Sequence, residues 1–306
     1  MCNATWHNGN DPSHPVGPEI SSPLWHWTAF PSILGESFVA KLDSLENVGV
    51  FVKNLKNAKQ FYTRKVGLAL RDEMKKFGYV ALGATKGGAD AELNLWAPEL
   101  SWGAERYESG LKQIGGVTGV GFLSFNLAKT IEALKARGVD AAVDTDSPRF
   151  GRFTDPDGNV VFIVEPAKVK VKRAGLAALT FVTVASRDRK KAGAFFTKTL
   201  GMKALRMPGE DQNFTSYALN SKGTSITPFT PTKEMYTNPA DYDADMAHIG
   251  EQTSIGFTSR DVYGLQEALM GKGVRFTQKA EKKDWGGIQA RFLDPDDNEY
   301  SVVQSP

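Results

Sequence analysis

The sequence predicts an α+β fold in which four βαβββ units form two tandem domains. Three landmarks, namely a helix end, a later helix with its closing glycine and a tight turn, occur twice in the same order, about one domain length apart. Within each copy the spacing of apolar residues changes from strand-like to helical and back again, twice. The short periods of solenoid repeats are absent, so a whole domain has been duplicated.

The duplicated segments match in residue type. Each copy holds an aromatic pair before a glycine, a Glu-Ala-Leu helix followed by Gly-Val, and an Asp-Pro-Asp turn that ends in Asn. The first copies are 61–68, 132–139 and 153–159, and the second copies are 195–202, 267–274 and 292–298. Asp and Asn side chains in such turns bond to their own backbone, so we interpret the turns as structural and not as calcium loops.

Residues 1–44 precede the first copy and are rich in proline and tryptophan. Proline at this density disfavours helices and central strands. We expect an extended arm whose Trp rings pack on the folded domains, with the covering of a cavity as the alternative. Residues 167–175, which include a Lys-rich run, are predicted to link the two domains.

The first domain is predicted over residues 45–166. Valines alternate from Val48 to Val52 as in a strand, and the helical spacing from Leu55 to Tyr62 predicts a helix that is closed by Gly67. The further strands and the second helix follow in the order expected for two βαβββ units. Their ranges are 68–74, 79–84, 91–96 and 120–125, then a helix at 127–137 and strands up to 165.

The second domain, residues 176–306, repeats this order. Its connection at 230–252 is longer than a structural joint requires, so we expect it to cover the cleft of this domain. This connection contains His248, which we expect either to be simply exposed to solvent or to take part in proton transfer. The segment Trp285-Gly286-Gly287 precedes the last hairpin and is predicted to be either a ligand-facing loop or a plain turn.

Composition narrows the classes of function. The chain of 306 residues is 41% hydrophobic and 24% charged, with a formal net charge of +2, so neither nucleic acid nor a membrane is expected as a partner. The single cysteine excludes an intramolecular disulfide and fits a reducing compartment, and no apolar run has membrane-spanning length. We expect a cytoplasmic monomer or homodimer.

The order of these motifs resembles the vicinal oxygen chelate superfamily, which includes glyoxalase I, extradiol dioxygenases, fosfomycin-resistance proteins and bleomycin-binding proteins. The resemblance rests on the helix that ends F-Y-x-x-x-x-G-L and on the D-P-D-G-N turn before the final strand, and it covers residues 45–166 and 176–304. It implies that the two units of each domain curl their strands into a cleft that holds a small ligand.

The resemblance also identifies the positions that carry metal ligands in such proteins. They are filled by Asn47, Glu92, Phe122 and Phe162 in the first domain, and by Phe181, Ser225, Ser254 and Ser301 in the second. Only Glu92 is a good ligand for a divalent cation, whereas a metal site needs three or four converging donors. We therefore expect no bound metal and no other cofactor.

What the resemblance leaves in the first-domain cleft is one carboxyl group between apolar walls. Desolvation beside Phe122 and Phe162 would raise the pKa of Glu92 toward neutrality, which suits a general base. Asn47 would polarise a carbonyl of the substrate. The alternative to a role as general base is that Glu92 is exposed to solvent or forms an ion pair with a nearby Arg or Lys. The first-domain cleft is accordingly the expected site, with the second domain mainly structural.

The same face implies a set of ligand-binding side chains. They are Asn94, Trp96, Phe122, Phe162, Trp102 and Tyr107. The aromatic members can stack a planar ligand, or they can form the edge of the core.

Three functions are consistent with this reading. The first is a metal-independent isomerase, lyase or cyclase that acts on a small hydrophobic or aromatic compound. The second is a protein that binds or sequesters such a compound without turnover, as the bleomycin-resistance members do. The third is a metal-dependent dioxygenase or glyoxalase with unusual ligands, which the residues favour least.

Overall fold

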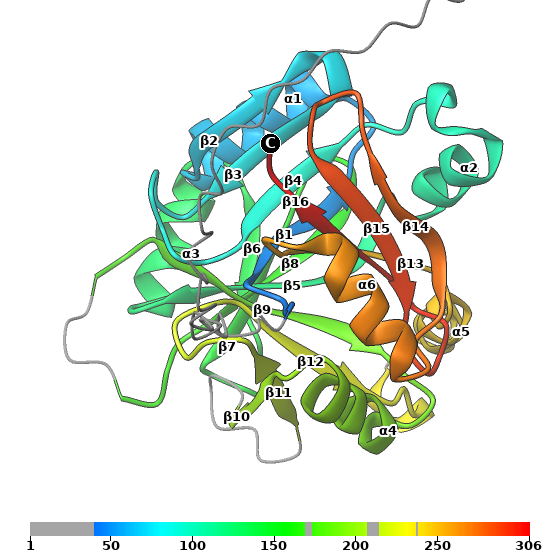
Figure 1. Ribbon diagram of the computed structural model, residues 1–306. Helices are drawn as coiled ribbons and strands as arrows, with labels where there is room; N and C mark the ends of the chain where they lie inside the picture. Colours follow the sequence, from blue (N-terminus) through cyan, green and yellow to red (C-terminus); the bar gives the residue numbers. More distant parts are fainter. Residues whose placement is uncertain (1–39, 169–172, 207–213, 237) are drawn as a thin grey trace, which may run out of the picture. The chain divides into compact units, whose positions relative to one another are not determined.

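The computed structural model describes residues 40–168, 173–206, 214–236 and 238–306. It contains four βαβββ units in succession (Figure 1), which confirms the predicted α+β fold with tandem domains. The predicted arm lies outside the described residues as far as residue 39, and so does the middle of the predicted linker. None of the helices in the described ranges combines the length and apolar character needed to cross a membrane.

The first two units fill the chain up to residue 164. The first unit comprises β1 (Ser44–Phe51), α1 (Leu55–Gln60) with a π-helical turn (Phe61–Val66), β2 (Ala69–Met74), β3 (Tyr79–Gly83) and β4 (Glu92–Trp96). A helix that the sequence patterns did not predict, α2 (Ala104–Lys112), leads to the second unit. That unit comprises β5 (Gly116–Ser124), α3 (Leu127–Ala136), β6 (Asp140–Val143), β7 (Phe150–Thr154) and β8 (Asn159–Val164).

The third and fourth units repeat this order. The third comprises β9 (Leu176–Ala185), α4 (Arg189–Ala194) with a π-helical turn (Phe195–Thr199), β10 (Lys203–Arg206), β11 (Thr215–Ala218) and β12 (Ser225–Phe229). Within the long connection lies α5 (Pro239–His248). The fourth comprises β13 (Gln252–Thr258), α6 (Val262–Gly271), β14 (Phe276–Lys282), β15 (Ile288–Leu293) and β16 (Glu299–Gln304).

All four unit helices begin at an Asn or Asp whose side chain accepts a backbone N–H of the first turn. These N-cap residues are Asn54, Asn126, Asp188 and Asp261. Such caps satisfy a donor that the helix itself leaves free, typically worth about 1 kcal/mol each. The first helix ends at Gly67, whose φ of 93° is left-handed and favours glycine.

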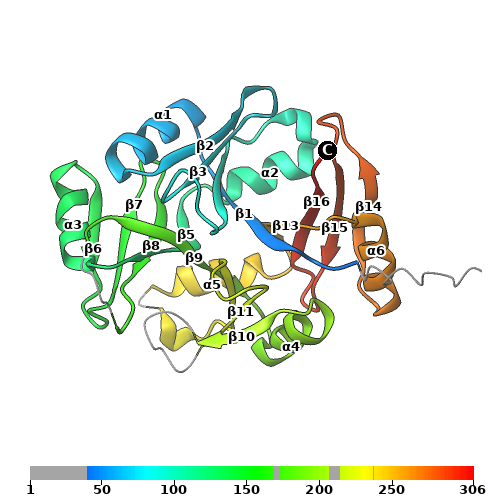
Figure 2. The ribbon, with the colours of Figure 1, turned by 60° about the vertical axis from the view of Figure 1, so that its left-hand side comes forward.

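The strands form two eight-stranded sheets, and each sheet combines units from both domains. The first sheet has the order β14-β15-β16-β13-β1-β4-β3-β2, and the second β10-β11-β12-β9-β5-β8-β7-β6. The first unit therefore pairs with the fourth, through β1 and β13, and the second with the third, through β5 and β9 (Figures 1 and 2). The expectation that the two units of one domain build one cleft is wrong.

One face of the first sheet is covered by helices. Val48 and Val50 of β1 and Val302 of β16 belong to the same buried core as Ala58 of α1 and Leu265 of α6. Since side chains alternate along a strand, the residues between them point to the opposite face. We call that opposite face, which turns away from α1 and α6, the inner face of the first sheet.

The Asp-Pro-Asp turns tie the two sheets together. Asn159, fully buried after the first turn, donates from Nδ2 to the carbonyl oxygen of Phe51 at the end of β1 and to Asp155 Oδ2, at 3.0 and 2.9 Å. Its Oδ1 accepts the Gly115 backbone N–H at 2.8 Å. Asn298 in the second copy makes the equivalent three bonds. The turns are thus structural, as predicted from their residues.

Candidate functional site

The inner face of the first sheet carries the two residues that the sequence singled out for chemistry. Asn47 of β1 and Glu92 of β4 are directly paired in parallel strands, so they are neighbours and do not face each other across a cleft. The same alternation places Asn94 and Trp96 on this face, beside Gly49 and Phe51 of β1.

Glu92 lies half-buried at the wall of a pocket of about 360 Å³. Burial raises the pKa of its carboxyl group above the ordinary value, and the negative charge of Glu46 raises it further. Arg71 acts in the opposite direction, but its guanidinium is held by Asp90 Oδ1 at 2.7 Å and by the carbonyl oxygens of Thr85 and Asp90. Among the residues that the structure describes, none makes a direct ion pair with Glu92, whose carboxyl group is more readily protonated than that of an exposed glutamate.

An aromatic cluster closes one end of the inner face. The Trp96 ring lies 4.7 Å from Tyr79 and 5.9 Å from Trp102, measured between ring centroids, and Trp102 lies 6.3 Å from Phe51. Trp102 lies two residues before the start of α2, and α2 carries the half-buried Tyr107. Two of the predicted stacking residues, Trp96 and Trp102, thus contact each other and keep partly exposed surfaces.

Unpaired polar atoms are concentrated on this face. Asn94 Oδ1, Ser254 Oγ and Arg291 Nε are buried and lack a hydrogen-bond partner in the described part of the chain. Asn94 and Ser254 flank Gly49, because a Cβ at Gly49 would lie 2.9 Å from Ser254 Cβ and Asn94 is the β4 partner of Gly49. A buried polar atom without a partner costs about 1–3 kcal/mol, which a bound ligand with matching groups would recover.

The structure places Phe122 on the wrong face for a ligand. Phe122 is fully buried in the main core, on the face of β5 that α3 covers. In the first sheet Val48 of β1 pairs with Ile255 of β13. The site residues Asn47 and Ser254 directly precede these two in sequence. In β5 the corresponding paired residue is Val120, and the residue directly before it is Gly119, whose φ of 72° is close to the 56° of Ser254. The predicted position was therefore displaced by three residues.

Phe162 lies in the second sheet, away from Glu92, on the face opposite the main core, which we call the inner face of the second sheet. It packs against Phe181, whose ring covers Gly121 so closely that a Cβ there would collide with it. Val164, Leu123 and other apolar side chains complete this patch. The expectation of apolar walls beside Glu92 is wrong, because Phe122 and Phe162 both belong to the second sheet, the first in the main core and the second against Phe181.

The residues that do share the inner face with Glu92 come from both domains. Ser254 and Ser301, expected in the cleft of the second domain, lie in the first sheet with Asn47 and Glu92. Sequence reasoning missed Arg291 of β15, which pairs with Ser301 across the strands. Its only signal was its place in an alternating strand, between the buried Ala290 and Phe292.

The donor set does not fit a divalent metal. The inherited positions of the first sheet supply one carboxylate, one amide and two hydroxyls, and Ser301 Oγ donates to the Ile255 carbonyl oxygen at 3.3 Å. Those of the second sheet supply Phe181, Phe162, Gly119 and Ser225, which are poorer still. Among the described residues no group of three His, Cys, Asp or Glu converges. Metal sites in proteins use three or four strong donors.

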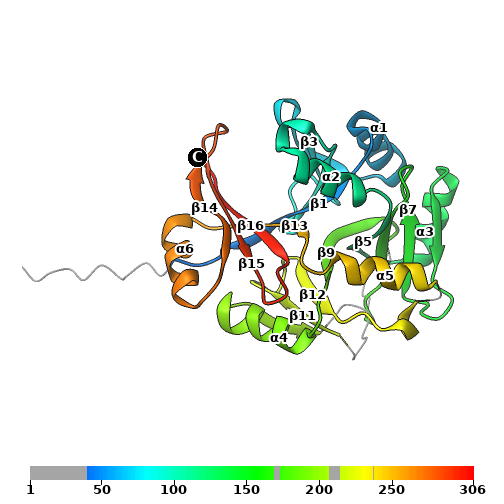
Figure 3. The same cartoon turned by 90° about the vertical axis from the view of Figure 1, so that its right-hand side faces the viewer.

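Other predicted candidates have structural partners. His248, the last residue of α5, is exposed, and its Nδ1 lies 2.9 Å from Glu251 Oε2. The α5 helix contacts β9 of the second sheet (Figure 3). The Trp285 ring folds back over Gly287, and Gly286 has a φ of 95°, so this segment is a turn.

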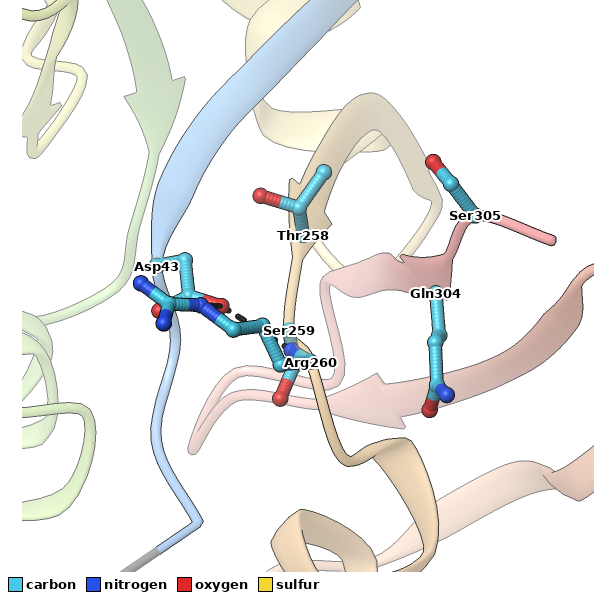
Figure 4. A pocket seen from close by; sticks show the side chains of 6 residues that line it. All are labelled: Asp43, Thr258, Ser259, Arg260, Gln304 and Ser305. Carbon is cyan, nitrogen blue, oxygen red and sulfur yellow. Dashed lines mark hydrogen bonds and ion pairs between the residues drawn. The ribbon is translucent and has the colours of Figure 1, made fainter.

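A second pocket of about 390 Å³ opens beside the start of β1 (Figure 4). Its charged lining residues, Asp43 and Arg260, already bond to each other: Asp43 Oδ2 accepts the Arg260 backbone N–H at 2.9 Å, and the guanidinium Nε lies 3.6 Å away. With its charges satisfied, this pocket is a weaker candidate than the inner face.

Comparisons with known proteins agree with the fold. The sequence profile of the Glyoxalase/Bleomycin resistance protein/Dioxygenase superfamily matches residues 44–163 and 178–302. Glyoxalase I from Zea mays is similar in structure at 17% identity with a TM-score of 0.59, over 87% of this chain and 93% of that chain. No match to a curated protein sequence is found.

Two shorter proteins match about half of the chain. A member of the glyoxalase/bleomycin resistance protein/dioxygenase superfamily from Sphaerobacter thermophilus DSM 20745 is 27% identical, over 42% of this chain and 98% of that chain, with a TM-score of 0.36. TnmS3, an antibiotic binding protein from Streptomyces sp. CB03234, is 21% identical, over 44% and 100%, with a TM-score of 0.34.

Proposed function

Because the chain belongs to the Glyoxalase/Bleomycin resistance protein/Dioxygenase superfamily, we propose that the inner face of its first sheet binds a small hydrophobic or aromatic molecule. We further propose that Glu92 acts on this molecule as a general base, without a metal ion. The observation that carries the proposal is a half-buried carboxyl group with a raised pKa at a pocket wall, on the same sheet face as an aromatic cluster and three unpaired polar atoms.

The chemistry needs one proton acceptor and one group that stabilises charge. The Glu92 carboxylate takes a proton from the bound molecule and becomes a carboxylic acid, while the electron pair moves onto a carbonyl oxygen of the substrate. The acid then returns the proton to another atom in an isomerisation, or to the leaving group in an elimination. A base works best with a pKa near the working pH, and burial moves Glu92 in that direction.

To Asn47 we assign the stabilisation of the developing charge. The amide of Asn47 packs over Gly256, where a Cβ would lie 2.7 Å from Nδ2 and 2.8 Å from Oδ1. Asn47 is paired with Glu92 on the adjacent strand. An amide N–H aimed at a substrate oxygen stabilises an oxyanion where water is excluded. The small residue at position 256 leaves the space that this orientation requires.

The test starts with a ligand screen by thermal shift. A ligand that binds the native state alone adds about 2.7 kcal/mol at 100 times its Kd. Each hit is then incubated with the wild type, with Glu92→Gln and with Glu132→Gln, which changes an exposed glutamate on α3. We expect turnover by the wild type and Glu132→Gln, and binding without turnover by Glu92→Gln.

A second function is favoured by the same unpaired atoms, since they reward capture as much as chemistry. In that case the wild type binds a hit and releases it unchanged. A hit that Glu92→Gln turns over at the wild-type rate would refute the role of Glu92 as base.

A further inference from the structure

Two arginine side chains share one carboxylate on the β15–β16 side of the first sheet. Arg291 donates from a guanidinium N–H to Glu299 Oε1 at 3.0 Å, and the guanidinium of Arg106 on α2 lies 3.7 Å from the same oxygen. Thr277 donates to the other oxygen of Glu299. Two cations therefore share one carboxylate whose oxygens are both engaged.

Arg291 is the less satisfied of the two cations. Its side chain is 15% exposed, and its Nε is one of the three buried atoms of the inner face for which the described residues offer no partner. Burial lowers the pKa of Arg291 and the nearby charge of Arg106 lowers it further, only partly offset by Glu299. An arginine stays charged in proteins, so this environment favours the approach of another anion.

Small residues separate Arg291 from the proposed base. Across the sheet the paired positions run from Arg291 through Ser301 and Gly256 to Asn47 and then Glu92. Four strand spacings of about 4.8 Å separate the backbones of the first and last, roughly 19 Å in all. A ligand on this face can thus meet Arg291 at one end and Glu92 nearer the other.

We propose that the molecule bound on the inner face carries a compact anionic group, such as a carboxylate, sulfonate or phosphate, that Arg291 binds through Nε. This inference rests on the proposed function and adds the class of ligand. The anion accepts the unpaired N–H of Arg291 and balances the second guanidinium, while the apolar part of the ligand lies toward Trp96. A charge-assisted bond of this kind discriminates strongly against a neutral analogue.

The experiment uses two fluorescent probes that differ in one group. They are 8-anilinonaphthalene-1-sulfonate and N-phenyl-1-naphthylamine, which has the same aromatic skeleton without the sulfonate. Their affinities are measured for the full-length wild type, for Arg291→Gln and for Arg275→Gln, a control that removes an exposed arginine paired with Asp297. We expect Arg291→Gln to weaken the sulfonate probe at least tenfold, about 1.4 kcal/mol, and to leave the neutral probe within twofold.

A second variant guards against misfolding of the first. Arg291→Lys keeps a charge opposite Glu299 but lacks the Nε–H, and the same selective loss is expected, because lysine cannot reproduce the fork of arginine. Equal weakening of both probes, no change in either, or equal effects of Arg275→Gln would overturn the inference.

Ser301→Phe separates this inference from the proposed function. A ring at position 301 fills the middle of the inner face, so it abolishes binding of both probes if they bind there. Loss of both probes in Ser301→Phe, with no effect of Arg291→Gln, refutes the anion inference and leaves the proposed site standing. Unchanged binding in Ser301→Phe refutes both.

Discussion

Replacing Asn159 with Ala removes the amide that joins the turn after β7 to the end of β1. The side chain makes three hydrogen bonds, to the Phe51 carbonyl oxygen, to Asp155 Oδ2 and from the Gly115 N–H. Each contributes about 1 kcal/mol net, and a buried group left without a partner costs about 1–3 kcal/mol more. We expect Asn159→Ala to lower the free energy of unfolding by about 3–5 kcal/mol.

Thermal and urea unfolding followed by circular dichroism measure this loss. For a chain of this size 1 kcal/mol corresponds to about 2–4 °C, so the Tm should fall by roughly 10 °C. Asn298→Ala should cost about as much, because Asn298 makes the equivalent three bonds. Asn220→Ala is the control: this exposed residue accepts one backbone N–H, and its loss should cost less than about 1 kcal/mol. A loss below about 1 kcal/mol for Asn159→Ala would refute the assignment of the turn as a structural joint.

Three further predictions concern the pH dependence of stability at Glu92, the role of Phe181 and the metal content of the protein. Because the pKa of Glu92 is raised in the folded state, the protonated side chain favours folding at low pH, and this contribution to stability is lost as the pH rises through the folded-state pKa. Glu92→Gln should therefore have a higher Tm than the wild type at pH 8 and the same Tm near pH 4. A difference in Tm that grows toward acid would contradict this. Phe181→Ala should destabilise the protein by about 3–5 kcal/mol in urea unfolding, because the ring is 1% exposed, yet leave ligand binding on the first sheet unchanged; altered binding would show that the second sheet contributes to the site. Elemental analysis of the purified protein should find well under one transition metal per chain, and chelator treatment should leave thermal shifts by ligands intact, because the donors do not fit a metal; about one retained metal per chain would refute this.

The sequence predicted the fold because local periodicity and duplication act together. Helical and strand spacings depend on which side chains reach the core, and both are visible in a single chain. Two short helices, α2 and α5, were missed because they are largely polar and bury few apolar side chains. Nothing in their apolar pattern distinguishes them from a loop.

The site was predicted less completely, since alternation identifies a face without identifying the neighbouring strand. Glu92, Asn94 and Trp96 do lie on one face, but the strand beside β1 proved to be β13 and not β5. Phe122 was misplaced because the site position was counted three residues too far along β5: Gly119 and Gly121 lie on the face of Thr183 and Phe181, whereas Val120 and Phe122 lie in the core. Arg291 was missed because the charges around its guanidinium come from Glu299 on the neighbouring strand and from Arg106, which lies far away in sequence.

Pairing of the first unit with the fourth determines the order in which the protein can be completed during synthesis. Ser44 and Thr258, whose side-chain oxygens lie 2.6 Å apart across β1 and β13, are separated by 214 residues. Domains emerge from the ribosome at about 5–20 residues per second, so β1 waits tens of seconds as an edge strand, open to wrong partners. All strands of the second sheet are meanwhile already made. The face that carries Glu92 is thus finished last, and a chain that stops before β13 contains the proposed base but only half of the sheet that holds it.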